Sequence, residues 1–206
     1  APAGVGLSAV REALRTAFAE TDGALLGTRD GESGSCAAVA LVTATHAVAA
    51  HVGDCRVVLY RQGIALPLTA DHRAGAPREK ARVEAAGGFV AYGRVLGQLA
   101  VARSFGDASF KRFDVSAGQA SSPFLSELVS AVPDVTAVRW QPGDYLVLAC
   151  DGVWDVLTDQ QACDVVVAAH AAHGDMQAAV ERLVHVAEHE RNSQDNITAI
   201  AVHLAG

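Results

Sequence analysis

The chain reads Tyr145-Leu146-Val147-Leu148-Ala149-Cys150-Asp151-Gly152-Val153-Trp154-Asp155, a near-continuous apolar run followed by an acidic turn that contains glycine. The length of the apolar run favours a buried strand, and the Asp-Gly step marks its end. Shortly after the turn, Thr158 and Gln161 have the spacing of a helix capping box. A strand, a tight turn and a helix are therefore expected in succession.

The same kinds of element recur on both sides of this segment. Periodic apolar residues predict helices at 7–25, 77–86 and 176–189, and β-compatible runs predict strands at 36–44, 46–52, 56–60 and 197–204. Turn signals such as Gly53-Asp54 and Gln62-Gly63 separate the strands, which favours antiparallel pairing. Strand-rich blocks interleaved with helices predict an α+β fold with antiparallel sheets.

Composition narrows the class of protein. The chain has 206 residues, a net charge of −7 and 50% hydrophobic residues, which predicts a single packed domain and argues against nucleic acid as the main partner. The apolar runs are too short for a membrane span, and the first residues lack the pattern of a signal peptide. Oligomeric state is not indicated. No C-x-x-C pair occurs, so reduced thiols and an intracellular location, cytoplasmic or nuclear, are expected for the four cysteines, Cys36, Cys55, Cys150 and Cys163.

Four aspartates occupy ends of predicted strands or adjacent turns. Asp54 and Asp151 follow apolar runs, Asp155 lies four residues after Asp151, and Asp195 precedes the last strand. Taken singly, each Asp is a common turn residue. Taken together, carboxylates at one edge of a sheet repel one another unless a cation neutralises them, and oxygen ligands suit Mg²⁺ or Mn²⁺. The pattern thus indicates either ordinary turns or a divalent metal site.

The wider context of these aspartates is more specific. The run from Leu148 to Asp155 and the run Ser193-Gln194-Asp195-Asn196-Ile197-Thr198 resemble hallmark motifs of the type 2C metal-dependent Ser/Thr protein phosphatases. So do five further segments in the same order, and the set as a whole is therefore highly specific. These segments lie at 33–37, 50–56, 68–72, 79–88 and 94–107.

The resemblance implies both a fold and an activity. The fold would be a β-sandwich of two antiparallel sheets flanked by helices, a four-layer αββα arrangement that is N-terminally truncated here. The activity would be hydrolysis of phosphoserine and phosphothreonine in proteins by metal-activated water, with Mg²⁺ or Mn²⁺ as cofactor. Asp151 and Asp195 match ligands of the family's binuclear site, and Asp54 and Asp155 match ligands of a third, weaker site. Residues 108–132 match the family's flap.

The chain also departs from the family pattern. It lacks the Asp-Gly-His-Gly-Gly motif, and the family's phosphate-binding Arg and general-acid His lie in the same missing part, so the catalytic residues are expected upstream. Two explanations compete. The 206 residues are a single partial phosphatase domain that is inactive alone, or they form an inactive pseudophosphatase that acts as a protein-binding or regulatory module.

Other candidate groups have simpler interpretations. His185-Val186-Ala187-Glu188-His189 fits the H-x-x-E-H pattern of a zinc peptidase helix, but a catalytic zinc site needs a third protein ligand. Two solvated histidines are expected there, with incidental Zn²⁺ or Ni²⁺ binding as the alternative. His51 is expected to be structural, and Arg103 to form an ion pair with a site carboxylate. Cys150 precedes an acidic residue, which argues against a nucleophilic cysteine.

Overall fold

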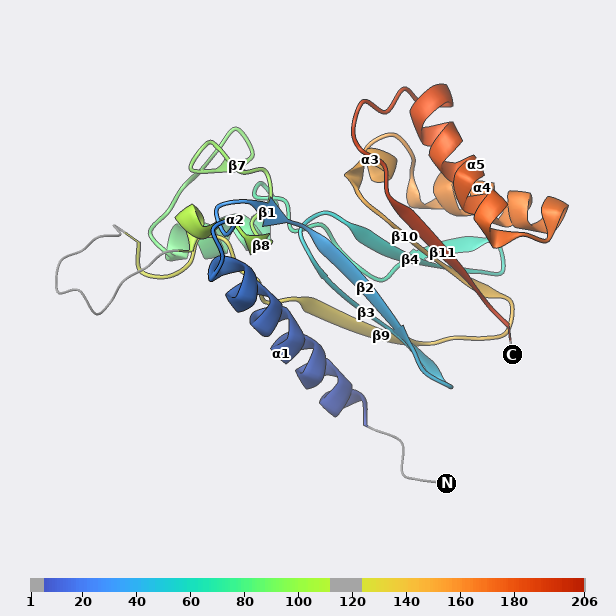
Figure 1. Cartoon of the computed structure of the whole chain (residues 1–206), viewed down its shortest axis with the longest axis horizontal. Helices are drawn as coiled ribbons and strands as arrows, with labels where there is room; N and C mark the ends of the chain where they lie inside the picture. Colours follow the sequence, from blue (N-terminus) through green and yellow to red (C-terminus); the bar gives the residue numbers. More distant parts are fainter. Residues whose placement is uncertain (1–5, 112–123, 206) are drawn as a thin grey trace. The chain divides into compact units, whose positions relative to one another are not determined.

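The computed structural model describes residues 6–111 and 124–205 (Figure 1). By its internal contacts the chain divides into two compact units, and it passes between them several times along its length. Among the described residues, the first unit comprises 6–37, 52–54, 71–111 and 124–134, and the second comprises 38–51, 55–70 and 135–205.

The second unit is built on a four-stranded antiparallel sheet in the order β11-β10-β4-β5. The central pair places Val147 of β10 opposite Val58 of β4, and Ala149 of β10 lies opposite Ala199 of β11. The end of β10 therefore lies beside the beginning of β11. The four strands are β4 (Arg56–Arg61), β5 (Ile64–Pro67), β10 (Asp144–Ala149) and β11 (Ala199–Leu204).

A second sheet, in the order β2-β3-β9, packs against the first. The apolar core between the two sheets takes alternate residues of the central strands, such as Val57 and Leu59 of β4, while Val58 faces the opposite side. This is the period-2 alternation expected of a strand that is buried on both faces. The three strands are β2 (Ala37–Val42), β3 (His46–Val52) and β9 (Asp134–Arg139).

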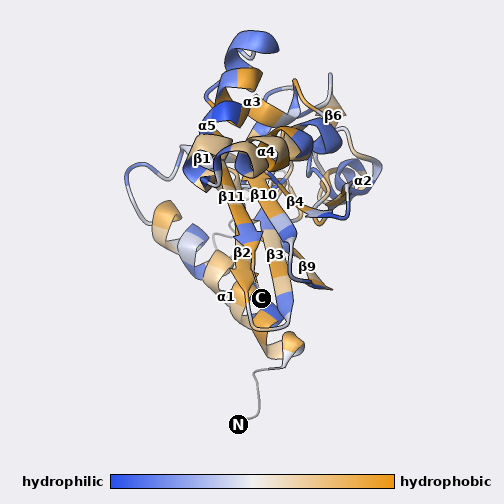
Figure 2. Cartoon of the chain, turned by 90° about the vertical axis from the view of Figure 1, so that its right-hand side faces the viewer, coloured by the Kyte–Doolittle hydropathy of each residue, from blue (hydrophilic) through white to orange (hydrophobic). Residues whose placement is uncertain are grey.

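Helices cover the other face of the four-stranded sheet (Figure 1). The Thr158–Gln161 capping box is present at the start of α4, and the Asp175 side chain caps α5. Gly174 adopts a left-handed conformation between the two helices, which favours glycine. Figure 2 shows apolar residues along β10 and β11 beneath this layer. Its elements are α3 (Asp151–Trp154), α4 (Asp159–His173), α5 (Met176–His185) and the π-helical turn η2 (Val186–Glu190).

The first unit combines helices with short strand pairs. Phe18 of α1 contacts Phe105 with ring centroids 5.1 Å apart, and the buried Asp22 carboxylate accepts hydrogen bonds from Gly106 N at 2.8 Å and Lys111 Nζ at 2.6 Å. These contacts fix α1 on its own unit. The elements are α1 (Leu7–Leu26), α2 (Pro77–Ala85), the pairs β1 (Gly34–Ser35) with β8 (Phe105–Gly106) and β6 (Val90–Ala91) with β7 (Arg94–Val95), and the 3-10 turn η1 (Ala108–Phe110).

The described ends of the predicted flap at 108–132, residues 108–111 and 124–132, belong to this unit, and residues 112–123 lie outside the described part. After that gap, Leu128 and Val129 are buried with Val83 of α2 and Val95 of β7. Leu128 N also donates to Phe110 O at 3.0 Å. The two described ends of the segment are therefore joined to each other and anchored in a core.

The predicted α+β sandwich is confirmed, and α1, α2, β3 and β4 begin at the expected residues. The second unit provides three of the four expected layers, two sheets and one layer of helices. The edge strand β11 is incompletely covered on the face that it shares with the core between the two sheets. Ile200 and Val202 of the edge strand β11 lie opposite core residues of β10, yet their exposed fractions are 55% and 37%.

Candidate metal centre

Strand pairing brings the segments of Asp151 and Asp195 together in the second unit. The β10–β11 ladder ends at Ala149 and Ala199, and Cys150 N then donates to Thr198 O at 3.1 Å. Beyond this point the segment after β10 and the segment before β11 remain in contact through side chains and the α3 turn. Asp151 thus follows the end of one strand while Asp195 precedes the start of its neighbour.

Gly152 makes this close approach possible. A Cβ atom on Gly152 would lie 2.3 Å from Asn196 O, which is a backbone atom. On the same side, the buried Ser193 hydroxyl donates to Gly152 O at 2.7 Å. The turn after β10 and the segment before β11 are therefore in direct contact, with Asp151 and Asp195 adjacent to the residues that touch.

Neighbouring backbone amides orient the two carboxylates. Asp151 Oδ1 accepts from Gly152 N at 3.0 Å, and Asp195 Oδ1 accepts from Asn196 N at 2.7 Å. Asp151 is half-buried and Asp195 is exposed. A hydrogen bond of this kind fixes the direction in which the carboxylate points. Two oriented oxygen donors of this type suit a hard divalent cation.

Asp155 follows Asp151 by one turn of α3, because Asp155 N donates to Asp151 O at 2.8 Å. Trp154 fixes this turn to the end of β10, because its Nε1 donates to Ala149 O at 2.7 Å. Arg56 of β4 stacks over the Trp154 ring at 5.8 Å and donates to Asp159 Oδ1 at 3.0 Å. The contacts of Trp154 and Arg56 therefore hold in place the turn that carries the exposed Asp155 carboxylate.

An open hollow of about 390 Å³ lies beside this turn. Its lining is largely polar and charged, so solvent and a charged ligand can reach Asp155. The lining residues are Arg56, Trp154, Asp155, Val156, Leu157, Thr158, Asp159 and Gln161.

Asp54 belongs to the first unit. It follows Gly53, which has a φ of +87°, and its buried carboxylate accepts from Cys36 Sγ at 3.4 Å and pairs with Arg73 at 3.5 Å. Arg73 also pairs with Asp71 at 3.3 Å. Within its own unit Asp54 is therefore part of an ionic cluster, and its role as a metal ligand stays a prediction.

Arg103 forms the predicted type of interaction with different partners. Its guanidinium lies 2.6 Å from Glu79 Oε1 and 3.1 Å from Asp134 Oδ1, instead of pairing with one of the four candidate aspartates. Both acidic residues lie in the first unit, far along the sequence from Arg103. Asp134 also contacts His72 Nε2 at 3.3 Å and Arg78 at 2.7 Å. Glu79 lies in the family-like segment 79–88, but the sequence of that segment does not indicate this network.

This network shifts the ionisation of both acids. Burial alone would raise the pKa of Asp134, but the hydrogen bond from Arg78 and the charge of Arg103 hold that pKa well below its ordinary value. Burial also opposes ionisation of Glu79, and hydrogen bonds from Arg103 and Arg82 lower its pKa. Both carboxylates are therefore charged and paired near neutral pH.

Other candidates are resolved by the structure. His51 is buried, with its Nε2 atom 2.8 Å from Ala70 O, which fits the expected structural role.

Within the described residues, no group of three or more His, Cys, Asp or Glu side chains is arranged to hold a metal ion. In the same part of the chain, no helix is long and apolar enough to cross a membrane.

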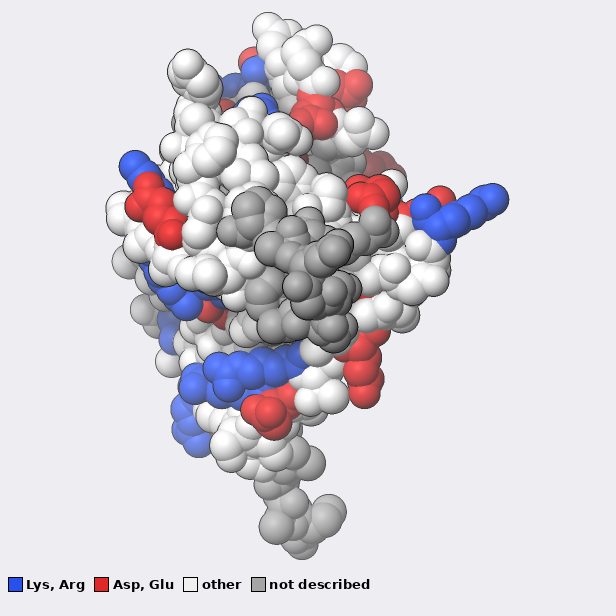
Figure 3. All heavy atoms as spheres, turned by 90° about the vertical axis from the view of Figure 1, so that its left-hand side faces the viewer, with Lys and Arg blue, Asp and Glu red and all other residues white. Residues whose placement is uncertain are grey.

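Figure 3 shows both basic (Lys, Arg) and acidic (Asp, Glu) side chains among the described residues of the face that it draws. The prediction that nucleic acid is not a partner stays a prediction.

Comparison with known proteins places the chain in a family. A model of the protein phosphatase 2C family matches residues 5–197. Protein phosphatase 2C homolog 2 of Schizosaccharomyces pombe is 39% identical over 84% of this chain and 46% of its own length. Probable protein phosphatase 2C 22 of Arabidopsis thaliana is 36% identical over 96% of this chain and 50% of its own length. The chain therefore belongs to the protein phosphatase 2C family.

Solved structures agree with this assignment. A phosphatase from Toxoplasma gondii covers 78% of this chain with a TM-score of 0.66 and 34% identity, over 48% of its own chain. A serine-threonine phosphatase 2C from the same organism covers 94% of this chain and 67% of its own, with a TM-score of 0.74 and 24% identity, which supports the fold. The chain spans about half the length of the curated relatives it matches.

Proposed function

We propose that this chain carries part of the catalytic site of a phosphatase that hydrolyses phosphoserine and phosphothreonine in proteins with the help of Mg²⁺ or Mn²⁺. The observation that carries the proposal is the contact between the Asp151 and Asp195 segments, made by the Ser193 hydrogen bond and by the absence of a side chain on Gly152. Family membership supports the reaction type.

The residues divide into ligands and supports. Asp151 and Asp195 would hold a divalent ion through carboxylate oxygens. Asp155 and, in the other unit, Asp54 remain candidate ligands for a further, weaker ion. When bound, such an ion lowers the pKa of a coordinated water and polarises a phosphoryl oxygen. The backbone amides of Gly152 and Asn196 orient the two carboxylates. Trp154 and Ser193 hold the two segments in place.

The catalytic residues beyond the metal ligands are expected outside the 206 residues. The Asp-Gly-His-Gly-Gly motif of the family does not occur in this sequence, and the Asp151–Asp195 pair alone provides few ligands. We propose that this chain by itself binds the ion weakly and has little or no activity. The activity would belong to a longer product that contains the motif.

An intracellular phosphoprotein is the proposed partner. All four cysteines lie in the described part of the chain and are thiols, which supports a reducing compartment.

One observation favours the alternative of an inactive regulatory module. The described residues contain no cluster of three or more potential metal ligands, and a pseudophosphatase would keep the sandwich without a complete metal site. The two functions differ in whether the longest product of the gene turns over substrate.

The deciding experiment measures Mn²⁺-dependent phosphate release from a phosphothreonine peptide, using both the 206-residue chain and the longest product that its gene encodes. We expect turnover in the longer product and a loss of about a hundredfold or more in Asp151→Asn and Asp195→Asn, because removing a ligand costs several kcal/mol of transition-state stabilisation. Asp30→Asn, at an exposed surface pair with Arg29, should retain full activity. A longer product that contains the motif, folds and binds Mn²⁺ without turnover would favour the regulatory module.

A further inference from the structure

The H-x-x-E-H segment has no part in the proposed phosphatase reaction. Helix α5 ends at His185 and continues as the π-helical turn η2, in which Arg191 N donates to Val186 O at 2.9 Å. His185 and His189, on either side of this change in winding, are both exposed.

The two imidazole rings lie face to face. Their centroids are 4.6 Å apart and their planes differ by 19°. Because both side chains are exposed, small rotations about their side-chain bonds can direct one nitrogen of each ring toward a common point. Metal–nitrogen distances of about 2.0–2.1 Å are within reach of residues four apart on a helix.

A carboxylate acts on one of the two rings. His189 Nδ1 lies 3.5 Å from Glu188 Oε2. When the Glu188 carboxylate accepts a hydrogen bond from Nδ1, the Nε2 lone pair is available to a cation. Such carboxylate–histidine pairs commonly accompany metal-binding histidines.

The surface beside the rings is accessible. A hollow of about 290 Å³ is lined by both histidines, by Glu188 and by Glu181, one helical turn before His185. The Glu181 carboxylate already accepts a hydrogen bond from Gln177 at 3.0 Å. We therefore assign it the role of adding negative potential near the ion, and not that of a third ligand. An ion could therefore bind with water completing its coordination.

We propose that His185 and His189 chelate one borderline divalent transition-metal ion, such as Zn²⁺, Ni²⁺ or Cu²⁺. Imidazole nitrogen suits these ions, whereas the carboxylates Asp151 and Asp195 suit Mg²⁺ and Mn²⁺. With two protein ligands, the site binds more weakly than a structural zinc site, which has four. Because the ion binds the folded junction of α5 and η2, it stabilises the fold by an amount that grows with the logarithm of the free-ion concentration above the dissociation constant, and it takes no part in hydrolysis.

The test is a calorimetric titration of tag-free protein with Ni²⁺ and Zn²⁺ at pH 7.5, where unperturbed imidazoles are neutral. We expect one ion per chain, and at least about a tenfold loss of affinity in either His185→Gln or His189→Gln, because each variant removes one of the two ligands. Glu188→Gln should weaken binding by up to about tenfold.

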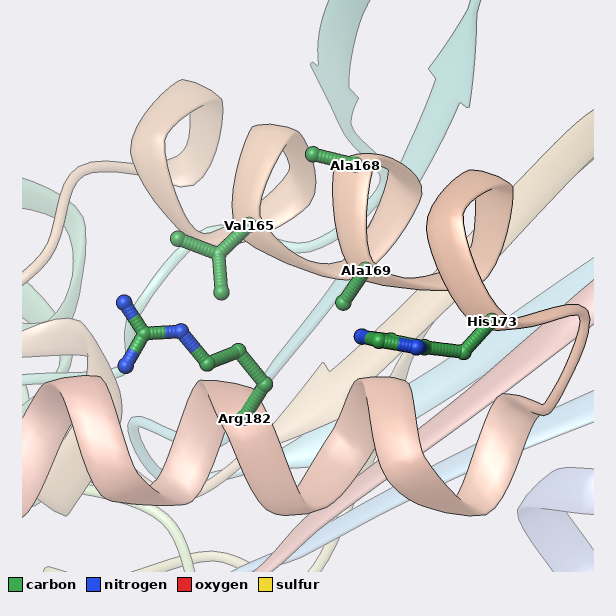
Figure 4. Close-up of a pocket in the computed structure, with 5 residues that line it drawn as sticks. All are labelled: Val165, Ala168, Ala169, His173 and Arg182. Carbon is green, nitrogen blue, oxygen red and sulfur yellow. The ribbon is translucent and has the colours of Figure 1, made fainter.

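A histidine of the same helical layer that does not line this hollow provides the control. Figure 4 shows His173 at the end of α4, reaching into the groove between α4 and α5 that Val165, Ala168, Ala169 and Arg182 also line. His173→Gln should bind like the unmodified chain. Equal loss in the control, or unchanged affinity in both His185→Gln and His189→Gln, would overturn the proposal.

A second measurement needs no variant. Substoichiometric Cu²⁺ added to the unmodified protein should broaden the ring NMR signals of His185 and His189 before those of the other six of its eight histidines. Uniform broadening of all the signals would overturn the proposal.

Discussion

Gly152 shows how a single residue sets the geometry of the candidate metal centre. The sequence places a glycine after Asp151, which is easily explained as a turn residue. The structure gives a different reason, because the position lies against the backbone oxygen of Asn196 and has no room for a side chain. The glycine is therefore required by the segment before β11, which is distant in the sequence.

Gly152→Ala should destabilise the chain by about 1–3 kcal/mol, since the added methyl group must displace a backbone segment. Chemical denaturation measures this change. The matched control is Gly23→Ala within α1, where a Cβ would have no neighbour within 4 Å and where we expect a gain of about 0.5–1 kcal/mol. Equal effects of the two substitutions would refute the steric explanation.

At the scale of elements, the sequence predicts what depends on local pattern. The alternation in β4 and the capping box of α4 are visible because they involve neighbouring residues. The sequence pattern does not indicate that β11 starts late, at Ala199 instead of Ile197. There, the Cys150 sulfur accepts from Thr198 N at 3.2 Å and donates to Asn196 O at 3.2 Å, so the regular ladder ends early.

The junction of α5 and η2 also lies beyond local pattern. Apolar periodicity predicts one continuous helix at 176–189, whereas the regular α-helix ends at His185. The Val186 and Ala187 side chains are both buried in the core beneath the helices. A wider turn lets these successive residues pack there, and only tertiary packing determines where it occurs.

The start of α4 supports the Asp155 turn, because Thr158 caps the helix directly after it. The Thr158 hydroxyl accepts from Gln161 N at 3.2 Å. Thr158→Ala should lower the free energy of unfolding by about 1 kcal/mol through loss of the cap. Thr158→Ser keeps the hydroxyl and should remain within a few tenths of the original value. Urea denaturation of both variants decides, and an equal loss in Thr158→Ser would contradict the capping role.

At the scale of the whole molecule, the ordered motifs predict the sandwich and its four candidate aspartates, but not the ionic network of the first unit. Arg103 and Asp134 are 31 residues apart, and nothing in either local sequence indicates the pairing. The exposed fractions of Ile200 and Val202 could not be predicted either, because they depend on which strands neighbour β11.

The network predicts a pH dependence of stability. Because the folded state lowers the pKa of Asp134 below its ordinary 3.8 and that of Glu79 below its ordinary 4.5, their stabilisation is fully present above these ordinary values. It is lost as the pH falls below them and the carboxylates become protonated.

Urea denaturation between about pH 7 and pH 3 should therefore show stability falling in the acidic range. Asp134→Asn, although less stable at pH 7, should show a shallower decline. A decline of the same steepness in the variant would assign the acid sensitivity to other groups.

The most direct test is whether Asp151 and Asp195 together bind one divalent cation. Titration of the 206-residue chain with Mn²⁺, followed by the electron paramagnetic resonance signal of the free ion, measures this binding. If the two aspartates share one cation, binding should be weak, lost in both Asp151→Asn and Asp195→Asn, and kept in Asp30→Asn. Binding that survives in both single variants, or tight binding of two ions by the unmodified chain, would contradict it.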